Sequence, residues 1–119
     1  MSEQRPIVIA AGGTGGHLFP AEALAVALRA RGIRVVLATD GRVQEIAKTF
    51  PAETVIQIPS ATPSGGSVFA KALAALRLGR GVLRSLRALR AIRPGCVVGF
   101  GGYPTVPPVF AATMLHMPT

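Results

Sequence analysis

The chemistry-bearing residues of this chain begin with a glycine-rich run, Gly12-Gly13-Thr14-Gly15-Gly16-His17, placed between an apolar segment and a segment of helical spacing. A glycine loop that joins a strand to a helix N-terminus is a common phosphate site, because glycine lets the backbone approach an anion closely. The run lacks the Gly-Lys-Ser/Thr of a P-loop, and Leu18 stands where a dinucleotide fingerprint has its third glycine. A tight turn, with glycines required by geometry alone, is the alternative interpretation.

His17 ends this run and is a candidate general base, because an imidazole can take a proton near neutral pH. The same side chain could instead cap the loop or donate a hydrogen bond to a backbone carbonyl, and the loop sequence leaves both roles open. Nowhere do histidine, cysteine and carboxylate side chains cluster with metal-ligand spacing. The sequence therefore predicts neither a metal site nor a cofactor.

A second glycine turn, Gly99-Phe100-Gly101-Gly102-Tyr103-Pro104-Thr105, follows another apolar segment late in the chain. Two such turns at one edge of a sheet could hold the two faces of a diphosphate, or two different substrates. The alternative is again turn geometry, with Tyr103 lying over the core as a lid. Taken together, the two turns favour a binding site more than either turn does alone.

The elements that position these turns alternate between apolar and helical segments. We expect strands at 7–11, 34–39, 54–58 and 96–100, and helices at 20–31, 43–50, 68–92 and 107–115. Pro20 suits a first helical turn, and an interruption of the third helix at 79–81 stays open. Near-continuous apolar strands alternating with helices predict a doubly wound α/β fold, a parallel sheet covered on both faces. Ligands of such sheets bind beyond the carboxyl ends of the strands, where both glycine turns fall.

The composition sets the size and class of the protein. With 119 residues, half of them hydrophobic, the chain is one ordinary domain or part of a larger one. Its single cysteine cannot form an internal disulfide, which fits a reducing compartment. The sequence shows neither a secretory pattern nor an apolar stretch of the ~20 residues that span a bilayer. Because it stops where another strand is expected, we interpret it as an incomplete unit.

The charge is strongly asymmetric along the chain. The net charge is +8, all five acids lie in the first 53 residues, and seven basic side chains follow Glu53 with no carboxylate among them. Such a balance suggests nucleic acid, an anionic membrane surface or a phosphorylated substrate as partner. Nucleic acid is disfavoured, because the chain has no tryptophan and only one tyrosine to form a stacking platform.

The expected helix at 68–92 carries most of this charge. Arg77, Arg80, Arg84 and Arg87 recur at helical spacing and form one stripe. A core-facing amphipathic helix with a solvated basic face explains much of the pattern. An excess of apolar residues beside these cations also indicates a peripheral contact with an anionic membrane surface. The candidate membrane-contact residues are Val68, Phe69, Leu73, Leu76, Arg77, Arg80 and Arg84.

The two glycine motifs, with Leu18-Phe19-Pro20-Ala21 after the first, closely resemble the N-terminal domain of the MurG family, the peptidoglycan N-acetylglucosaminyltransferases. The resemblance covers essentially the whole chain. It implies that residues 1–119 are the Rossmann-like, acceptor-binding half of a two-domain GT-B fold, and that the chain alone is inactive without the donor-binding domain. It also implies inverting transfer of GlcNAc from UDP-GlcNAc to the C4 hydroxyl of undecaprenyl-diphospho-MurNAc-pentapeptide, at the cytoplasmic face of the bacterial inner membrane.

The resemblance further implies roles for single residues. Gly13, Thr14, Gly15 and Gly16 would lie against a diphosphate or the donor nucleotide, and His17 would deprotonate the acceptor hydroxyl. The acceptor side would be lined by Gly101, Gly102 and Tyr103. The loop at 60–67 departs from the family, because it lacks the arginines and lysines that many relatives carry there. Two alternatives from other classes stay open: a non-catalytic nucleotide- or phosphate-binding module, and a plain membrane-surface anchor.

Overall fold

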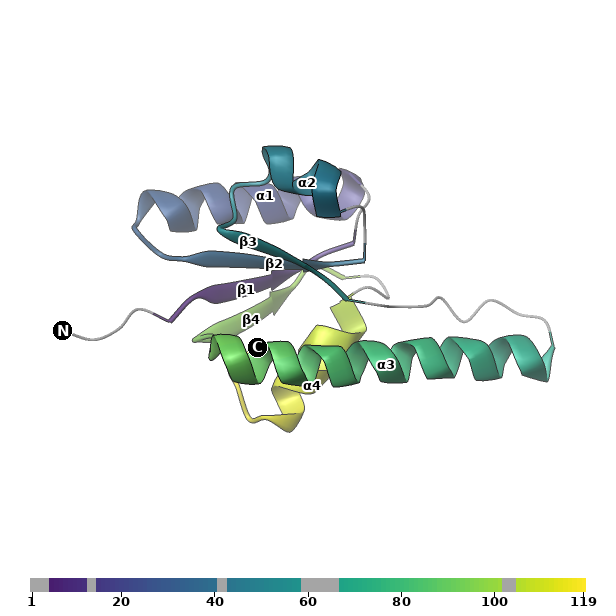
Figure 1. The fold of residues 1–119 in the computed structure, drawn as a ribbon. Coiled ribbons are helices and arrows are strands. Elements are labelled where there is room, and N and C mark those ends of the chain that lie inside the picture. Colours follow the sequence, from purple (N-terminus) through teal and green to yellow (C-terminus); the bar gives the residue numbers. More distant parts are fainter. Residues whose placement is uncertain (1–4, 13–14, 41–42, 59–66, 102–104) are drawn as a thin grey trace.

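The computed structural model describes residues 5–12, 15–40, 43–58, 67–101 and 105–119. Strands and helices alternate along the whole chain: β1 (Ile7–Ala10), α1 (Gly15–Ala30), β2 (Val35–Thr39), α2 (Val43–Thr49), β3 (Thr54–Gln57), α3 (Val68–Ile92), β4 (Cys96–Gly99) and α4 (Val106–Met114). Helices α1 and α2 cover one face of the sheet, and α3 and α4 cover the other (Figure 1). This arrangement confirms the doubly wound α/β fold.

The sheet is parallel, with its four strands in the order β3-β2-β1-β4. Every residue of β2 is buried, as expected for a strand with neighbours on both sides and helices on both faces. The structure starts or ends each strand within one residue of the predicted bounds, because the apolar runs that predict the strands are also what the two helical layers bury.

Alternate side chains of the strands pack into two separate hydrophobic cores. Val8 and Val36 pack with Val97 beneath α3 and α4, where Leu89 completes the cluster. Their sequence neighbours point the other way, toward α1 and α2. That second cluster contains Ile9, Val35, Leu37, Ala21, Ala25 and Phe50. Because successive side chains of a strand point to opposite faces, each face of the sheet has its own core. The sheet edge with the glycine turns lies between the two helical layers.

Helix α1 begins at Gly15, so the predicted start at 20 is wrong. Pro20 lies inside the helix, in its second turn, where it removes only the hydrogen bond to the Gly16 carbonyl. The predicted start rested on Pro20, which suits a first helical turn, but the helix includes Gly15 and Gly16 as well, because packing overrides the low helix propensity of glycine. Leu18 already packs against the α1 core, one turn ahead of Ala21. Gly32, with a φ of +78°, follows the helix and ends it.

Helix α3 runs unbroken for 25 residues through Gly79 and Gly81, so the interruption left open at 79–81 is absent. Ser67 caps its N-terminus, the Oγ accepting a hydrogen bond from the Ala70 N–H over 3.2 Å. Gly81, Ser85 and Leu89, four residues apart, are its buried positions. The N-terminal half of the helix extends past the sheet (Figure 1). The sheet therefore does not cover that half of the helix, which can contact another surface.

Candidate functional site

The two glycine turns leave the sheet from neighbouring strands at one edge. Strands β1 and β4 pair in parallel, with Ala10 opposite Gly99. The Phe100 N–H continues this ladder past the end of β4 and donates a hydrogen bond to the Ala10 carbonyl oxygen over 3.0 Å. On the other side the Ala11 N–H donates to the Ala38 carbonyl over 3.1 Å. The predicted placement of both turns at the carboxyl edge is therefore confirmed.

The first turn is shorter than the glycine run suggests. Gly15, Gly16 and His17 form the beginning of α1, so His17 occupies the third position of a helix instead of a loop. The N–H groups of a first helical turn lack intrahelical acceptors and carry the positive end of the helix dipole. No acidic side chain lies in this turn of α1. The remaining predicted residues of the run, Gly13 and Thr14, lie outside the described residues.

In the second turn, the structure explains why glycine is needed at two positions. Gly101 adopts a φ of +91°, which side chains rarely tolerate. A Cβ on Gly99 would lie 2.9 Å from Cγ2 of Val109, so β4 and α4 approach more closely there than any larger residue allows. Gly102 and Tyr103, the other predicted acceptor-side residues, fall outside the described part of the chain. Whether Tyr103 contacts a substrate or covers the core stays a prediction.

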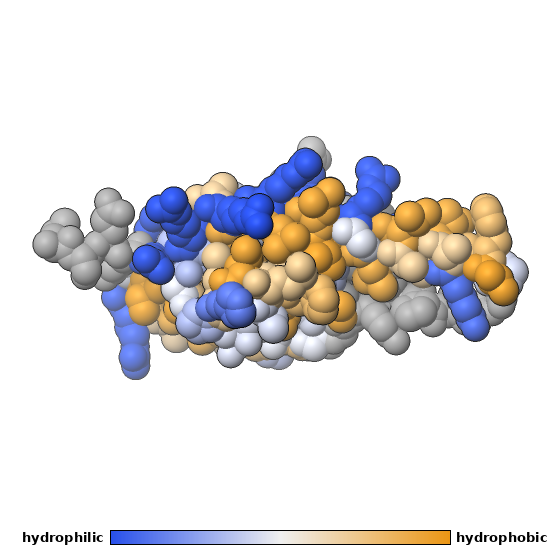
Figure 2. Space-filling model, turned by 90° about the horizontal axis from the view of Figure 1, so that it is seen from below, coloured by the Kyte–Doolittle hydropathy of each residue, from blue (hydrophilic) through white to orange (hydrophobic). Residues whose placement is uncertain are grey.

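The predicted membrane-contact side chains are exposed along the first two-thirds of α3, from Val68 to Arg84. Val68 is 84% exposed, Phe69 73% and Leu76 65%, which is unusual for large apolar residues. Leu73 is also exposed, and so are Arg77, Arg80 and Arg84. Figure 2 shows hydrophobic side chains gathered at this end of the molecule with hydrophilic ones projecting among them. None of the described helices is long and apolar enough to cross a bilayer.

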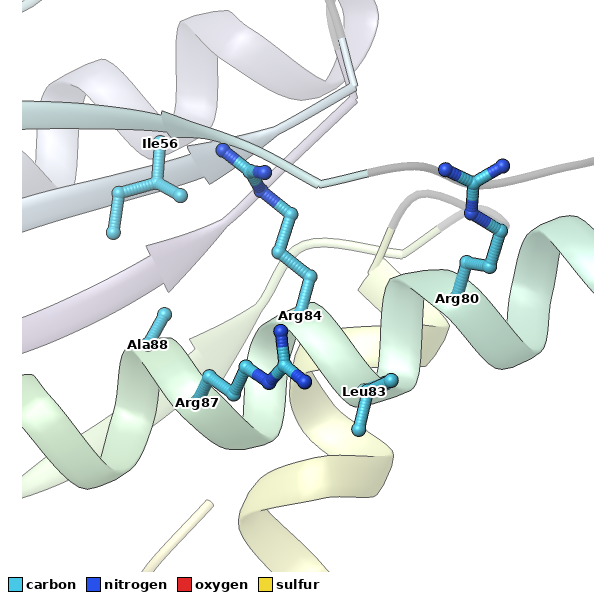
Figure 3. Close-up of a pocket in the computed structure, with 6 residues that line it drawn as sticks. All are labelled: Ile56, Arg80, Leu83, Arg84, Arg87 and Ala88. Atoms are coloured by element: carbon cyan, nitrogen blue, oxygen red, sulfur yellow. The ribbon is translucent and has the colours of Figure 1, made fainter.

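Arg80 and Arg84 also line a hollow of about 590 Å³ between α3 and β3. Arg87, Leu83, Ala88 and Ile56 complete its walls (Figure 3). Sequence reasoning placed Arg87 on the basic stripe but assigned it no site, and it gave Ile56 only a strand position. The absence of acids after Glu53 signals the positive charge of this hollow in the sequence. The approach of β3 to α3, which forms the hollow, is seen only in the fold.

Away from these surfaces, a bidentate ion pair joins the segments that lead into β2 and β3. Arg34 Nη2 lies 2.8 Å from Glu53 Oε1, and Arg34 Nε lies 3.1 Å from both carboxylate oxygens. Hydrogen bonding to this guanidinium lowers the pKa of Glu53, and the same contact raises the pKa of Arg34. Both side chains are solvent-accessible, so the pair contributes modestly to stability.

Comparisons with known proteins agree with this geometry. Residues 7–119 match the glycosyltransferase family 28 N-terminal domain. The UDP-N-acetylglucosamine--N-acetylmuramyl-(pentapeptide) pyrophosphoryl-undecaprenol N-acetylglucosamine transferase of Methylobacterium sp. (strain 4-46) is 62% identical over 120 residues, covering 100% of this chain and 32% of that protein. Its namesake in Rhodopseudomonas palustris (strain HaA2) is 50% identical over 119 residues, with coverage of 100% and 32%.

The fold is similar to solved glycosyltransferases. The crystal structure of Acinetobacter baumannii MurG superposes with a TM-score of 0.74 and 29% identity, over 98% of this chain and 34% of that one. The calicheamicin glycosyltransferase CalG4, at 22% identity and a TM-score of 0.66, covers 98% of this chain and 32% of its own and shares the fold alone. The chain therefore spans about a third of the length of the relatives it matches.

Proposed function

The chain belongs to glycosyltransferase family 28, and on this premise we propose that it is the N-terminal, acceptor-binding part of an N-acetylglucosaminyltransferase of peptidoglycan synthesis. The proposed reaction is inverting transfer of GlcNAc from UDP-GlcNAc to the C4 hydroxyl of undecaprenyl-diphospho-MurNAc-pentapeptide. Relatives that are 50% to 62% identical carry names that describe this transfer. Because this chain spans about a third of them, we assign the reaction to the longer protein and expect the chain alone to be inactive.

The observation that carries the proposal is the pairing of Ala10 with Gly99. It brings the N-terminus of α1 and the second glycine turn to one edge of the sheet, where α/β folds bind ligands. The N–H groups in the first turn of α1, which have no intrahelical acceptor, suit the oxygens of a diphosphate. The second turn, which follows the neighbouring strand β4, would supply a wall against which an acceptor sugar can lie.

The proposed chemistry needs one base, and we place it at this edge of the sheet. His17, at the third position of α1, would accept the proton of the acceptor C4 hydroxyl. As that oxygen forms its bond to C1 of GlcNAc, the bond between C1 and the diphosphate oxygen breaks and UDP leaves with the electron pair. A single displacement of this kind inverts the configuration at C1, and neither a cofactor nor a covalent intermediate is required of this chain.

The proposed acceptor is membrane-borne, so we also propose that α3 binds the anionic surface of the bacterial inner membrane from its cytoplasmic face. Exposed Phe69 and Leu76 would enter the interface while Arg77, Arg80 and Arg84 meet head groups. Peripheral contact is the mode that an amphipathic helix of this type supports. Peptidoglycan synthesis at this surface would link the protein to cell shape and division.

Calorimetric titration of the 119-residue chain tests the assignment of the acceptor half. We expect a short-chain lipid-diphosphate MurNAc-pentapeptide to bind, and UDP-GlcNAc to bind more weakly or not at all. Farnesyl diphosphate, which lacks the sugar, is the control that separates recognition of the acceptor from attraction of charge. Tighter binding of UDP-GlcNAc than of the acceptor would contradict the proposal and favour a non-catalytic nucleotide-binding module.

A further inference from the structure

The hollow between α3 and β3 lies at the same carboxyl end of the sheet as the glycine turns. Ile56, on its β3 wall, is in register with Ala38 of β2, which pairs with Ala10 of β1. Ala10 in turn lies opposite Gly99, the last residue of β4. The hollow is therefore two strands away, along this end of the sheet, from the point where the first glycine turn leaves β1.

This placement puts the hollow within reach of a group attached to the proposed acceptor sugar. Neighbouring strands lie about 4.8 Å apart, so two strand spacings amount to about 10 Å. An extended pentapeptide covers up to about 17 Å, at roughly 3.4 Å for each residue. When the acceptor sugar lies at the glycine turns, its pentapeptide can therefore extend past β2 and bring its far end to β3.

The hollow presents positive charge where such a peptide would end. Arg84 and Arg87 line it from α3, three residues apart and therefore on one side of the helix. Figure 3 shows the Arg84 guanidinium extending toward the sheet and the Arg87 guanidinium turned toward the base of Arg84. Among the residues that the structure describes, no carboxylate lies at salt-bridge distance from either side chain. Because the sequence has no acid after Glu53, neither α3 nor its neighbour α4 supplies a counter-ion.

The proposed acceptor carries an anion that suits these two side chains. A pentapeptide joined to muramic acid through its N-terminus ends in a free C-terminal carboxylate. A guanidinium binds a carboxylate through two parallel hydrogen bonds, a geometry that a lysine ammonium does not offer. Ile56 and Ala88 give the hollow an apolar wall for the carbon atoms of the last peptide residues. Its volume of about 590 Å³ lies within the range of sites that hold small molecules.

We propose that Arg84 and Arg87 bind the C-terminal carboxylate of the acceptor pentapeptide, so that this hollow is the peptide subsite of the acceptor-binding half. The inference rests on the proposed function, which provides the acceptor. Because the carboxylate lies at the far end of the peptide from the sugar, the two arginines determine which acceptor binds and take no part in the bond-forming step. Arg84 is also a proposed membrane contact, so the two roles are separated by working without a membrane.

Transfer by the full-length protein tests the subsite with two soluble acceptors that differ only at the end of the peptide. Both are short-chain lipid-diphosphate MurNAc-pentapeptides, one with a free C-terminal carboxylate and one with a C-terminal amide, and both are assayed without vesicles. The test variant is R84Q/R87Q. The matched control is R31Q/R90Q, which removes two charges from exposed positions outside the hollow. The single variants R84Q and R87Q guard against a folding defect of the double variant.

We expect kcat/KM of the wild type and of the control to be about tenfold or more higher for the carboxylate than for the amide, through KM and with little change in kcat. In R84Q/R87Q the value for the carboxylate should fall to that for the amide, and each single variant should lose part of the preference. The amide should be used equally well by the wild type and by R84Q/R87Q, because it lacks the charge that the arginines bind.

The outcomes separate failure of the subsite from failure of the proposed function. Equal use of both acceptors by the wild type, or a preference for the carboxylate that survives in the test variants, would overturn the subsite and leave the proposed function intact. Absence of transfer to either acceptor by the wild type would overturn the proposed function and the subsite with it.

Discussion

The backbone N–H of Phe100 donates a hydrogen bond to the carbonyl oxygen of Ala10 over 3.0 Å. Through this bond the first residue after β4 is fixed to the last residue of β1, from which the first turn departs. Two residues ninety positions apart in the sequence thereby share one backbone ladder. A substrate lying across both turns would rest on a rigid base, which favours close positioning of reacting groups.

The tight contact of β4 with α4 predicts that Gly99→Ala destabilises the fold. The added Cβ would meet the Val109 methyl at 2.9 Å, and a β-branched side chain has little freedom to move away. We expect the free energy of unfolding to fall by about 1–3 kcal/mol in urea denaturation. Gly79→Ala is the control: nothing lies within 4 Å of its Cβ position in α3, so it should stabilise by about 0.5–1 kcal/mol. Equal effects of the two substitutions would refute the packing argument.

The Arg34–Glu53 ion pair predicts a small stability difference that depends on pH. The pKa of Glu53 is lower in the folded chain than its ordinary value of 4.5, so the pair stabilises fully above that value. This stabilisation is lost as the pH falls through the folded pKa. Thermal unfolding of Glu53→Gln should therefore differ from wild type at neutral pH and converge with it in acid. A difference that persists unchanged in acid would assign the effect to packing.

Membrane binding should depend on the apolar side chains in the N-terminal half of α3. We expect Phe69→Ser with Leu76→Ser to lower the affinity for phosphatidylglycerol-containing vesicles about tenfold or more, because both side chains would leave the interface. Phe19→Ser with Val26→Ser is matched in exposure, at 72% and 54%, but lies on α1 across the sheet. That pair should bind as wild type does, and added salt should weaken both proteins. Loss of binding by the α1 pair would instead indicate a generally sticky surface.

The strands and the layer order were predictable because local patterns express them directly. An apolar run such as 35–39 is buried on both faces, and its length and composition reveal this in the sequence. The start of α1 was not predictable in this way, since Gly15 and Gly16 have low helix propensity and the packing of Leu18 against the sheet decides the outcome. Sequence spacing alone could align the arginines of α3, whereas only the fold brings Ile56 across from them.

The candidate site also combines features that the sequence predicts with features that only the fold decides. Both glycine turns were assigned to one edge from the order of elements, and the pairing of Ala10 with Gly99 confirms that placement. The structural demand on Gly99, by contrast, comes from Val109 ten residues later, on a helix whose approach no local pattern specifies. The roles of His17 and Tyr103 toward a substrate stay predictions that follow from the family resemblance.

The most direct test of the central claim is the turnover of the full-length protein when His17 is replaced. With UDP-GlcNAc and a lipid-diphosphate MurNAc-pentapeptide acceptor, His17→Asn should lower kcat by about 10²–10⁴-fold, the usual loss of a general base, with little change in the affinity for UDP-GlcNAc. His116→Asn changes the only other histidine of this chain, beyond the end of α4, and should leave kcat near the wild-type value. A kcat of His17→Asn within about threefold of wild type would contradict the assignment of His17 as the base at this sheet edge.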